Sequence, residues 1–259
     1  MALKTFTDQL GNRITISFPP QRIISLVPSQ TELLADFGLG DKVVGITKFC
    51  VYPEAWRKSK AVVGGTKKFE FDKIESLRPD LIIGNKEENY QQGIAQLKAE
   101  YPVWMSDIVT IKDALKMIYQ VGELTGADKA AGKIVNKINN AFSGIEKLPP
   151  LRTLYLIWRN PWMAAASGTF IHELMILAGL QNCLEASNRY PELSDEEIKT
   201  LDPELILLSS EPYPFQQKHV DEIQKICPSA KIVLVDGEMF SWYGSRLLEF
   251  PAYLKHWIH

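Results

Sequence analysis

Short, mainly apolar runs alternate with helical segments along the first half of the chain. The runs at 22–27, 43–47, 81–84 and 103–106 are four to six residues long, as is typical of buried strands. Residues 31–38 follow the first run and end in Gly38, which predicts a helix with Ser29 or Thr31 as its N-cap. A second helix is predicted over 71–77, directly before the third run. Strands alternating with helices predict a parallel or mostly parallel sheet, so the fold class is α/β.

The second half repeats this order of elements. The run 152–157 is followed by a predicted helix over about 169–178. Residues 31–39 align with 172–180 at an offset of 141, and residues 72–82 align with 196–206 at an offset of 124. We interpret the matches as two similar α/β lobes. The alternative is that any two helix-proline-strand units look alike.

An amphipathic segment connects the two halves. Its apolar residues fall at steps of three and four from Ala130 to Ile145, which predicts a helix from about Ala127 to Leu148 that ends at Pro149-Pro150. Such a helix would be about 33 Å long and would bridge the lobes. We therefore expect an N-terminal lobe over 1–109, a helical connector over 110–150 and a C-terminal lobe over 151–259.

Composition and charge exclude several classes of protein. Of the 259 residues, 46% are hydrophobic and the formal net charge is −2, with no long run of Lys and Arg, so neither disorder nor nucleic-acid binding is expected. Three cysteines are too few for a disulfide scaffold. No apolar run approaches the ~20 residues of a membrane span, and the first residues do not resemble a secretory signal. A cytoplasmic protein and one whose leader was removed both remain open.

The loops after the predicted strands are rich in aromatic and cationic residues. Ligands of open parallel sheets bind at these strand ends, and aromatic faces beside Arg and Lys suit a large, flat, partly anionic ligand. The alternative is that the aromatics plug the seam between the lobes and the cations are solvated. The predicted ligand-binding residues are Ser29, Tyr52, Thr66, Lys67, Asn85, Arg159, Trp162, Tyr190, Phe240, Trp242, Tyr243 and Arg246.

No pattern of a catalytic site is present. Ser29 and Cys50 are possible nucleophiles, but neither lies in a Gly-x-Ser-x-Gly elbow or beside a histidine. His172 could ligate a metal, although a polar residue at a helix start is the commoner interpretation. Residues 64–68 lack the spacing of a phosphate-binding loop. We therefore expect no enzyme activity, no metal ligated by the protein and no catalytic cofactor.

Several segments together resemble one family. Residues 5–14, 22–34, 43–46, Tyr52-Pro53 and 74–83 are similar to the substrate-binding proteins of iron-siderophore, haem and cobalamin ABC importers, the helical-backbone metal receptors. The resemblance extends from about Phe6 to Leu254. It implies the class III periplasmic-binding-protein fold, with two α/β lobes bridged by one long helix, and a metal chelate bound between the lobes without chemistry.

The resemblance also implies a partner and a location. One acidic residue of each lobe pairs with arginines of the membrane permease in this family, and the matching residues here are Asp72 and Glu196. Their simpler interpretation is as carboxylates favoured by a helix dipole. The family works in the periplasm or cell envelope, and we expect a monomer that does not insert into the membrane.

The ligand stays open at this point. Aligned on the cobalamin-binding members, tryptophans expected in the loops fall at Thr66 and Asn85, and a third becomes Tyr190. Loops more cationic than a near-neutral corrinoid requires favour an anionic siderophore or haem, with Lys67, Arg159 and Arg246 offsetting its charge. We expect capture of cobalamin or a ferric siderophore, or haem, for delivery to an ABC importer. The alternatives are a cytoplasmic chelate-handling protein or enzyme that keeps the receptor fold, and an interaction module whose seam is empty.

Overall fold

The computed structural model describes residues 2–258, which form two compact units. Unit 1 contains the residues up to Ile108 together with Lys112–Asn140 and Tyr243–Arg246. Unit 2 contains Val109–Ile111, Ala141–Trp242 and the residues from Leu247 onward. Each unit is therefore built from segments that are distant in the sequence, and a four-residue segment near the C-terminus belongs to unit 1.

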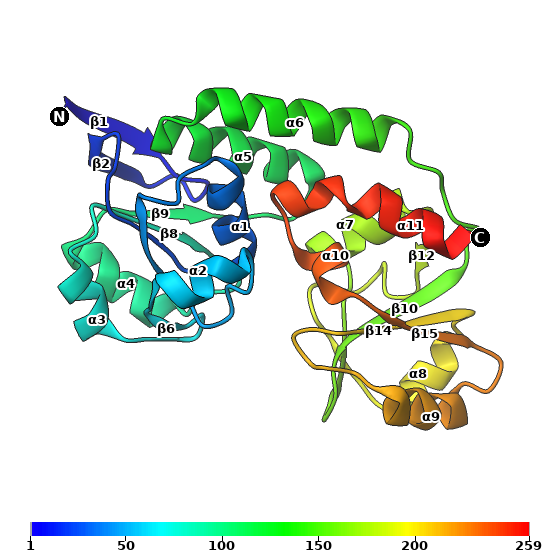
Figure 1. Ribbon diagram of the computed structural model, residues 1–259. Coiled ribbons are helices and arrows are strands. Elements are labelled where there is room, and N and C mark those ends of the chain that lie inside the picture. Colours follow the sequence, from blue (N-terminus) through cyan, green and yellow to red (C-terminus); the bar gives the residue numbers. More distant parts are fainter. Residues whose placement is uncertain (1, 259) are drawn as a thin grey trace. The chain divides into compact units, whose positions relative to one another are not determined.

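Unit 1 is built on a five-stranded parallel sheet (Figure 1). Along the sheet the strands are β5 (Ala61–Val62), β4 (Val43–Ile46), β3 (Ile23–Ser25), β8 (Leu81–Asn85) and β9 (Val103–Ser106). The four predicted strands are confirmed, and β8 is buried along its whole length. Two antiparallel pairs complete the strands of this unit, β1 (Ala2–Thr7) with β2 (Arg13–Phe18) and β6 (Gly64–Gly65) with β7 (Lys68–Phe69).

Helices follow the strands of unit 1. They are α1 (Pro28–Asp36), α2 (Glu54–Ser59), α3 (Phe71–Leu77), α4 (Gln91–Glu100), α5 (Ile111–Thr125) and α6 (Asp128–Ser143). The predicted N-cap of α1 was wrong, because the helix begins at Pro28 with Val27 as its N-cap and no side-chain cap. Proline is favoured at the first helical position, where its missing N–H costs nothing and its φ is already helical.

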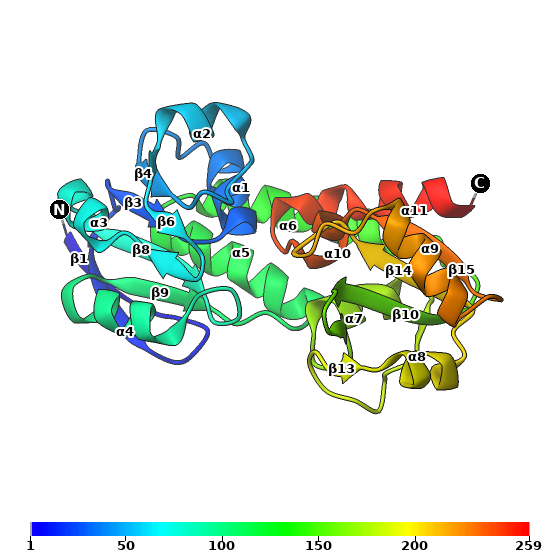
Figure 2. The same cartoon turned by 90° about the horizontal axis from the view of Figure 1, so that it is seen from below.

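Helices α5 and α6 lie side by side (Figures 1 and 2). Gly122 of α5 allows their close approach, since a Cβ there would lie 2.4 Å from the Cβ of Ala131 in α6. Helix α6 is the predicted connector, but it ends at Ser143 and not near Leu148. The helix ends directly before Gly144, a residue that disfavours helix. Residues 128–140 of α6 belong to unit 1 and residues 141–143 to unit 2.

Unit 2 contains a six-stranded sheet of mixed direction. Its strands β10 (Arg152–Trp158), β14 (Leu205–Ser209) and β15 (Lys231–Val235) are parallel, and β12 (Gln181–Asn182) pairs parallel with β10. β11 (Trp162–Ala164) and β13 (Glu192–Leu193) add an antiparallel edge. The helices are α7 (Phe170–Leu177), α8 (Asp195–Leu201), α9 (Gln217–Ile226), α10 (Gly237–Ser241) and α11 (Phe250–Ile258). A 3-10 turn at Ser245–Leu248 has its first two residues in unit 1 and its last two in unit 2.

The internal repeat has a structural counterpart. Helices α3 and α8 each end in a left-handed residue, Arg78 at φ 44° and Asp202 at φ 45°, and β8 and β14 begin three residues later. Every one of these positions keeps the offset of 124 residues. Helices α1 and α7 likewise both end before a glycine of positive φ, Gly38 and Gly179. The α/β fold class with mostly parallel sheets is confirmed. Among the described residues, no helix is long and apolar enough to cross a membrane.

Candidate functional site

Tyr52 lies beyond the end of β4 and presents an aromatic surface in unit 1. Its side chain is 42% exposed. The guanidinium carbon of Arg246 lies 4.3 Å from the centre of the Tyr52 ring. Arg246 in turn donates from Nε and Nη2 to the two carboxylate oxygens of Glu32 at 3.1 and 2.7 Å. The exposed ring therefore packs against an ion pair formed by the buried Arg246 and the half-buried Glu32.

The segment that carries Arg246 is fixed to unit 1 at further points. The Tyr243 hydroxyl donates to Glu88 Oε1 at 2.7 Å. Burial and then the charge of Glu88 raise the pKa of Tyr243 well above its ordinary value, so the phenol is the proton donor. Gly244 has φ +124°, and a Cβ there would lie 3.2 Å from the carbonyl oxygen of Ser29. Tyr243 and Arg246 are thus both buried and bound to carboxylates.

The other predicted residues of unit 1 shape its loops. Asn85 is buried and accepts from the backbone N–H groups of Glu87 and Glu88, and it donates to Ser106 Oγ at 3.0 Å. Its role is to fold the loop after β8. Ser29 is buried within α1. Thr66 is half-buried, and Lys67 is exposed and donates to the carbonyl of Glu87 at 2.8 Å.

The sequence-based site omitted an exposed aromatic residue of the same loop region. Phe49 precedes Tyr52 in the loop after β4, is 49% exposed and carries the Lys48 ammonium 5.0 Å from its ring centre. The loop 48–52 was marked as aromatic and cationic, but nothing in its sequence distinguishes the ring of Phe49 from a core residue.

Trp162 of unit 2 is a core residue. It is 2% exposed, its ring stacks on Phe215 with 6.2 Å between centroids, and its Nε1 donates to Asp195 Oδ1 at 2.8 Å. The Arg159 guanidinium covers the ring at 3.9 Å and donates from Nε to Glu222 at 3.1 and 3.2 Å. The expected free indole face is therefore already covered by protein groups.

Phe240 and Trp242 are also packed inside unit 2. Phe240 is 0% exposed and contacts the rings of Tyr155 and Phe250. The indole of Trp242 is buried and donates to Glu211 Oε1 at 2.9 Å. Tyr190 is half-buried, with the Arg189 guanidinium 5.6 Å from its ring centre. Of these predicted residues only Tyr190 has an open surface.

Unit 2 nevertheless exposes one tryptophan at a strand end. Trp158 at the end of β10 is 40% exposed and meets Tyr213 edge-on at 5.5 Å. Trp158 lies in the loop segment that the sequence marked as aromatic, but it was not included among the predicted ligand-binding residues. No signal in its sequence marks this ring as exposed, because residues 153–157 before it are all buried and the strand shows no alternation of buried and exposed side chains.

Two of the three cations expected to offset ligand charge have carboxylate partners, whereas the third, Lys67, donates to a backbone carbonyl. Arg246 is paired with Glu32 and Arg159 with Glu222, and the hydrogen bond from Arg159 lowers the pKa of Glu222. Lys86, in the loop after β8, is paired with Asp107 at 2.6 Å. The strand-end loops are therefore closer to electrical balance than their sequence indicates.

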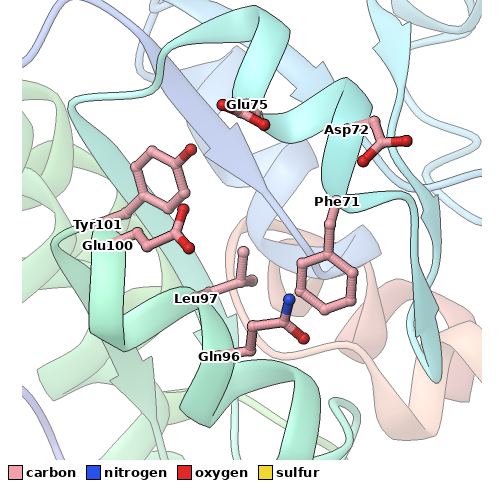
Figure 3. Close-up of a pocket in the computed structure, with 7 residues that line it drawn as sticks. All are labelled: Phe71, Asp72, Glu75, Gln96, Leu97, Glu100 and Tyr101. Carbon is pink, nitrogen blue, oxygen red and sulfur yellow. The ribbon is translucent and has the colours of Figure 1, made fainter.

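The two predicted docking carboxylates occupy equivalent positions. Asp72 is the second residue of α3 and Glu196 the second residue of α8, and both are exposed. Asp72 lines a pocket of about 150 Å³ between α3 and α4, together with Phe71, Glu75, Gln96, Leu97, Glu100 and Tyr101 (Figure 3). Partial burial, and then the charges of Glu100 and Glu75, raise the pKa of Tyr101. Ligand pockets are usually about 300–1,000 Å³, so this pocket is too small for a macrocycle.

Cys50 and His172 are both in contact with neighbouring polar side chains. Cys50 is buried, with Sγ 3.0 Å from Thr31 Oγ1 and 3.2 Å from Thr47 Oγ1, and burial raises its pKa. A thiol of raised pKa is a poor nucleophile. The His172 Nδ1 lies 3.1 Å from Asn182 Nδ2. Within residues 2–258 no three His, Cys, Asp or Glu side chains are grouped so that they could hold a metal ion.

Comparisons with known proteins point to one family. The family model described as periplasmic binding protein matches residues 23–226. A Bacillus subtilis ABC transporter substrate-binding lipoprotein, YvrC, is 28% identical over 95% of this chain and 82% of its own length. A vitamin B12-binding protein of Yersinia pestis is 27% identical over 86% of this chain and 80% of its own length.

Solved structures share the fold. The periplasmic vitamin B12 binding protein of Vibrio cholerae has a TM-score of 0.77 at 23% identity, covering 93% of this chain and 98% of that one. The periplasmic heme-binding protein of Roseiflexus has a TM-score of 0.77 at 21% identity, covering 91% of this chain and 98% of that one. At these identities the structures establish the architecture alone.

Proposed function

The chain belongs to the periplasmic binding protein family, with the class III fold of ABC-transporter substrate-binding proteins, and from this premise we propose that it captures a metal chelate and delivers it to an ABC importer. The observation that carries the proposal is the exposed ring of Tyr52 at the strand ends of unit 1. This ring packs against Arg246, which is paired with Glu32. A supported aromatic face binds a large apolar surface at low entropic cost.

We propose a corrinoid as the ligand, ahead of a ferric siderophore or haem. Arg246, Arg159 and Lys86 are paired with Glu32, Glu222 and Asp107, and this pairing reduces the attraction of these loops for a strongly anionic chelate. The relatives named above include proteins described as binding vitamin B12. Phe49 and Tyr52 in unit 1 are the aromatic residues proposed to contact the ligand there.

The proposed capture involves no chemistry. The named relatives are binding proteins, and Cys50 is a buried thiol of raised pKa. The proposal places the protein outside the cytoplasm, with Asp72 and Glu196 as the groups that meet the permease. A cytoplasmic chelate-handling enzyme with the same fold is not favoured by these relatives.

The experiment titrates the protein with cyanocobalamin, haem and a ferric hydroxamate siderophore by calorimetry, and compares Tyr52→Ala with the wild type. We expect saturable binding of cyanocobalamin and an affinity about tenfold lower in Tyr52→Ala, which corresponds to about 1.4 kcal/mol and matches the loss of one stacked aromatic face. Tyr119→Ala is the matched control, because Tyr119 is equally exposed (45%) but lies on α5, away from the strand ends.

Three results would contradict the proposal. Wild-type protein that binds none of the three chelates would remove chelate capture as the function. Equal affinity of Tyr52→Ala and the wild type for every chelate would remove the strand-end surface of unit 1 from the site. Tight binding of the siderophore alone would replace the corrinoid as the ligand.

A further inference from the structure

The sheet of unit 2 ends in a strand whose outer side is open. β15 is the last strand of that sheet and pairs only with β14. Its first residue, Lys231, donates to the carbonyl of Glu204, and the carbonyl of its last residue, Val235, accepts from the N–H of Ser210, each at 2.9 Å. Alternate residues of a parallel strand bond to the same neighbour. Val233, midway between them, therefore also bonds toward β14.

The two remaining residues of β15, Ile232 and Leu234, direct their N–H and C=O groups away from β14. Among residues 2–258, no protein group bonds to these four backbone groups. The next outward N–H, that of Asp236, is already bound to the Tyr253 hydroxyl at 3.0 Å. The open edge of β15 is thus formed by two donors and two acceptors, and strand groups of this kind can pair with another chain.

The other edges of the two main sheets are short or covered. β5, β12 and β13 have two residues each. β9 is longer, but it is buried along its whole length and the carbonyl of Met105 accepts from the N–H of Gln9 at 3.0 Å. The separate hairpin β1–β2 carries the charges of Lys4 and Arg13. Short strands, covering segments and charges discourage edge pairing, whereas β15 presents Leu234 with its side chain 44% exposed.

The outward groups of β15 are complementary to a second copy of the same strand. In an antiparallel pair, two residues that face each other either exchange both N–H···O bonds or exchange none. When Ile232 of one copy faces Leu234 of the other, all four outward groups of each strand are paired. Val233 then lies on the twofold axis and faces itself.

The neighbouring registers do not pair these groups. A shift by two residues in one direction requires the backbone of Ala230, whose N–H already donates to the carbonyl of Cys227 at 3.2 Å. A shift in the other direction requires the N–H of Asp236, which is bound to Tyr253. A shift by one residue turns groups that bond to β14 toward the second copy. Only the register centred on Val233 satisfies the open edge.

We propose that unit 2 pairs with a second copy of this chain through β15, antiparallel and about a twofold axis at Val233. The exposed Leu234 packs beside Ile232 of the second copy, and Lys231 faces Val235, so like charges do not meet. The inference does not depend on the ligand. It replaces the monomer that the family resemblance implies with a weak dimer, because one strand from each copy buries less area than a standard interface.

Sedimentation equilibrium of the whole chain, from about 10 µM to about 1 mM, measures this association. We expect the average mass of the wild type to rise with concentration. Leu234→Lys places a charge on the open edge and should weaken the association at least about tenfold. Leu3→Lys is the matched control, because Leu3 is a more exposed leucine (75%) on β1 of unit 1. It should associate like the wild type, and the thermal midpoint of each variant is measured alongside.

Cysteine crosslinking tests the register. Val233→Cys places two thiols in a non-hydrogen-bonded pair, whose Cα atoms lie about 4.5 Å apart, within the span of a disulfide. In Leu234→Cys the two thiols are offset by two residues along the strands, more than about 7 Å apart. Both are made on Cys183→Ser, since Cys183 is half-buried whereas Cys50 and Cys227 are buried. Under oxidation with copper phenanthroline, Val233→Cys should form dimers at least about tenfold faster, although residue 234 is the more exposed.

Each outcome decides the inference. A wild-type mass that stays that of the monomer at every concentration overturns it. A dimer that Leu234→Lys does not weaken is held by another surface and overturns it as well. Crosslinking of Leu234→Cys as fast as that of Val233→Cys refutes the twofold register. If Leu234→Lys does not fold, sedimentation of the wild type and the crosslinking pair decide the question.

Discussion

At the scale of single residues, His219 is the buried titratable group whose neighbours define its protonation state. Its Nδ1 accepts the backbone N–H of Gln216 at 2.9 Å, so in the neutral ring the proton must be on Nε2, which donates it to the Tyr213 hydroxyl at 3.1 Å. Phe215 covers the ring edge-on. A second proton on Nδ1 would point at the Gln216 N–H and break the start of α9.

This geometry predicts a pH-dependent stability. Burial, and then the charge of Lys218, lower the pKa of His219. The charge of Arg159 also lowers this pKa, and the charge of Glu222 raises it. A lowered folded-state pKa means that the contribution of His219 is complete above its unfolded value of about 6.5 and is lost as the pH falls toward the folded value. We expect the thermal midpoint to decrease as the pH is lowered from about 7.5 to about 5.5.

His219→Gln tests the assignment, because glutamine at this position can still accept from the Gln216 N–H but does not titrate. Its midpoint should change less over the same pH interval than that of the wild type. The control His256→Gln alters an exposed histidine on α11 and should keep the full pH dependence. Identical pH profiles for His219→Gln and the wild type would show that the loss comes from other groups.

Residue roles were only partly predictable from the sequence. The pattern predicts aromatic and cationic residues in the loops after strands, but it does not say which way a ring turns. Trp162 follows Pro161 and begins β11, which pairs with β10 and β13, and its ring is buried, whereas Trp158, four residues earlier, is exposed. The partners that neutralise Arg159 and Arg246 are 63 and 214 residues away, a distance at which no local pattern predicts pairing.

At the scale of elements, the packing of α5 on α6 depends on one glycine, which has no side chain. Gly122 lies in the last turn of α5, and glycine disfavours helix, yet a Cβ there would lie 2.4 Å from that of Ala131. A Cβ added to Gly132 in α6 would have no other group within 4 Å. Two glycines on neighbouring helices are therefore expected to respond oppositely to the same substitution.

Gly122→Ala should lower the free energy of unfolding by about 1–3 kcal/mol, because the cost of overpacking exceeds the gain in helix propensity. Gly132→Ala should raise it by about 0.5–1 kcal/mol, since only the propensity changes. Urea unfolding monitored by circular dichroism measures both. Stabilisation of the protein by Gly122→Ala would mean that the two helices separate at no cost and that the close contact is not required.

The elements themselves followed the sequence closely where periodicity and end signals agreed. The prediction of a helix over 71–77 matches α3 residue for residue, because α3 ends just before a proline-containing turn. Helix α6 was predicted too long, since apolar residues at 142 and 145 continue the period beyond Gly144, which ends it. The short strands β11, β12 and β13 were missed because two or three residues carry no period.

At the scale of the whole molecule, the repeat gives each unit one exposed carboxylate in the same structural position. Asp72 and Glu196 are both the second residue of a seven-residue helix that ends in a left-handed residue and leads into a central strand. As carboxylates near a helix start they would each contribute about 0.3–1 kcal/mol to stability through the helix dipole. That role requires no partner, whereas permease docking predicts an effect on import that does not depend on stability.

Charge reversal separates the two roles. Asp72→Lys and Glu196→Lys are expected to leave cyanocobalamin affinity unchanged, because neither residue lies at a strand end, and to lower import by a reconstituted cognate importer. The double variant should reduce uptake into vesicles by at least about tenfold, or about 1.4 kcal/mol of docking free energy. Glu54→Lys is the control, since Glu54 is an exposed acid in the first turn of α2 and its reversal has the same dipole cost. Equal import by the double variant and the control would assign Asp72 and Glu196 to helix stability alone.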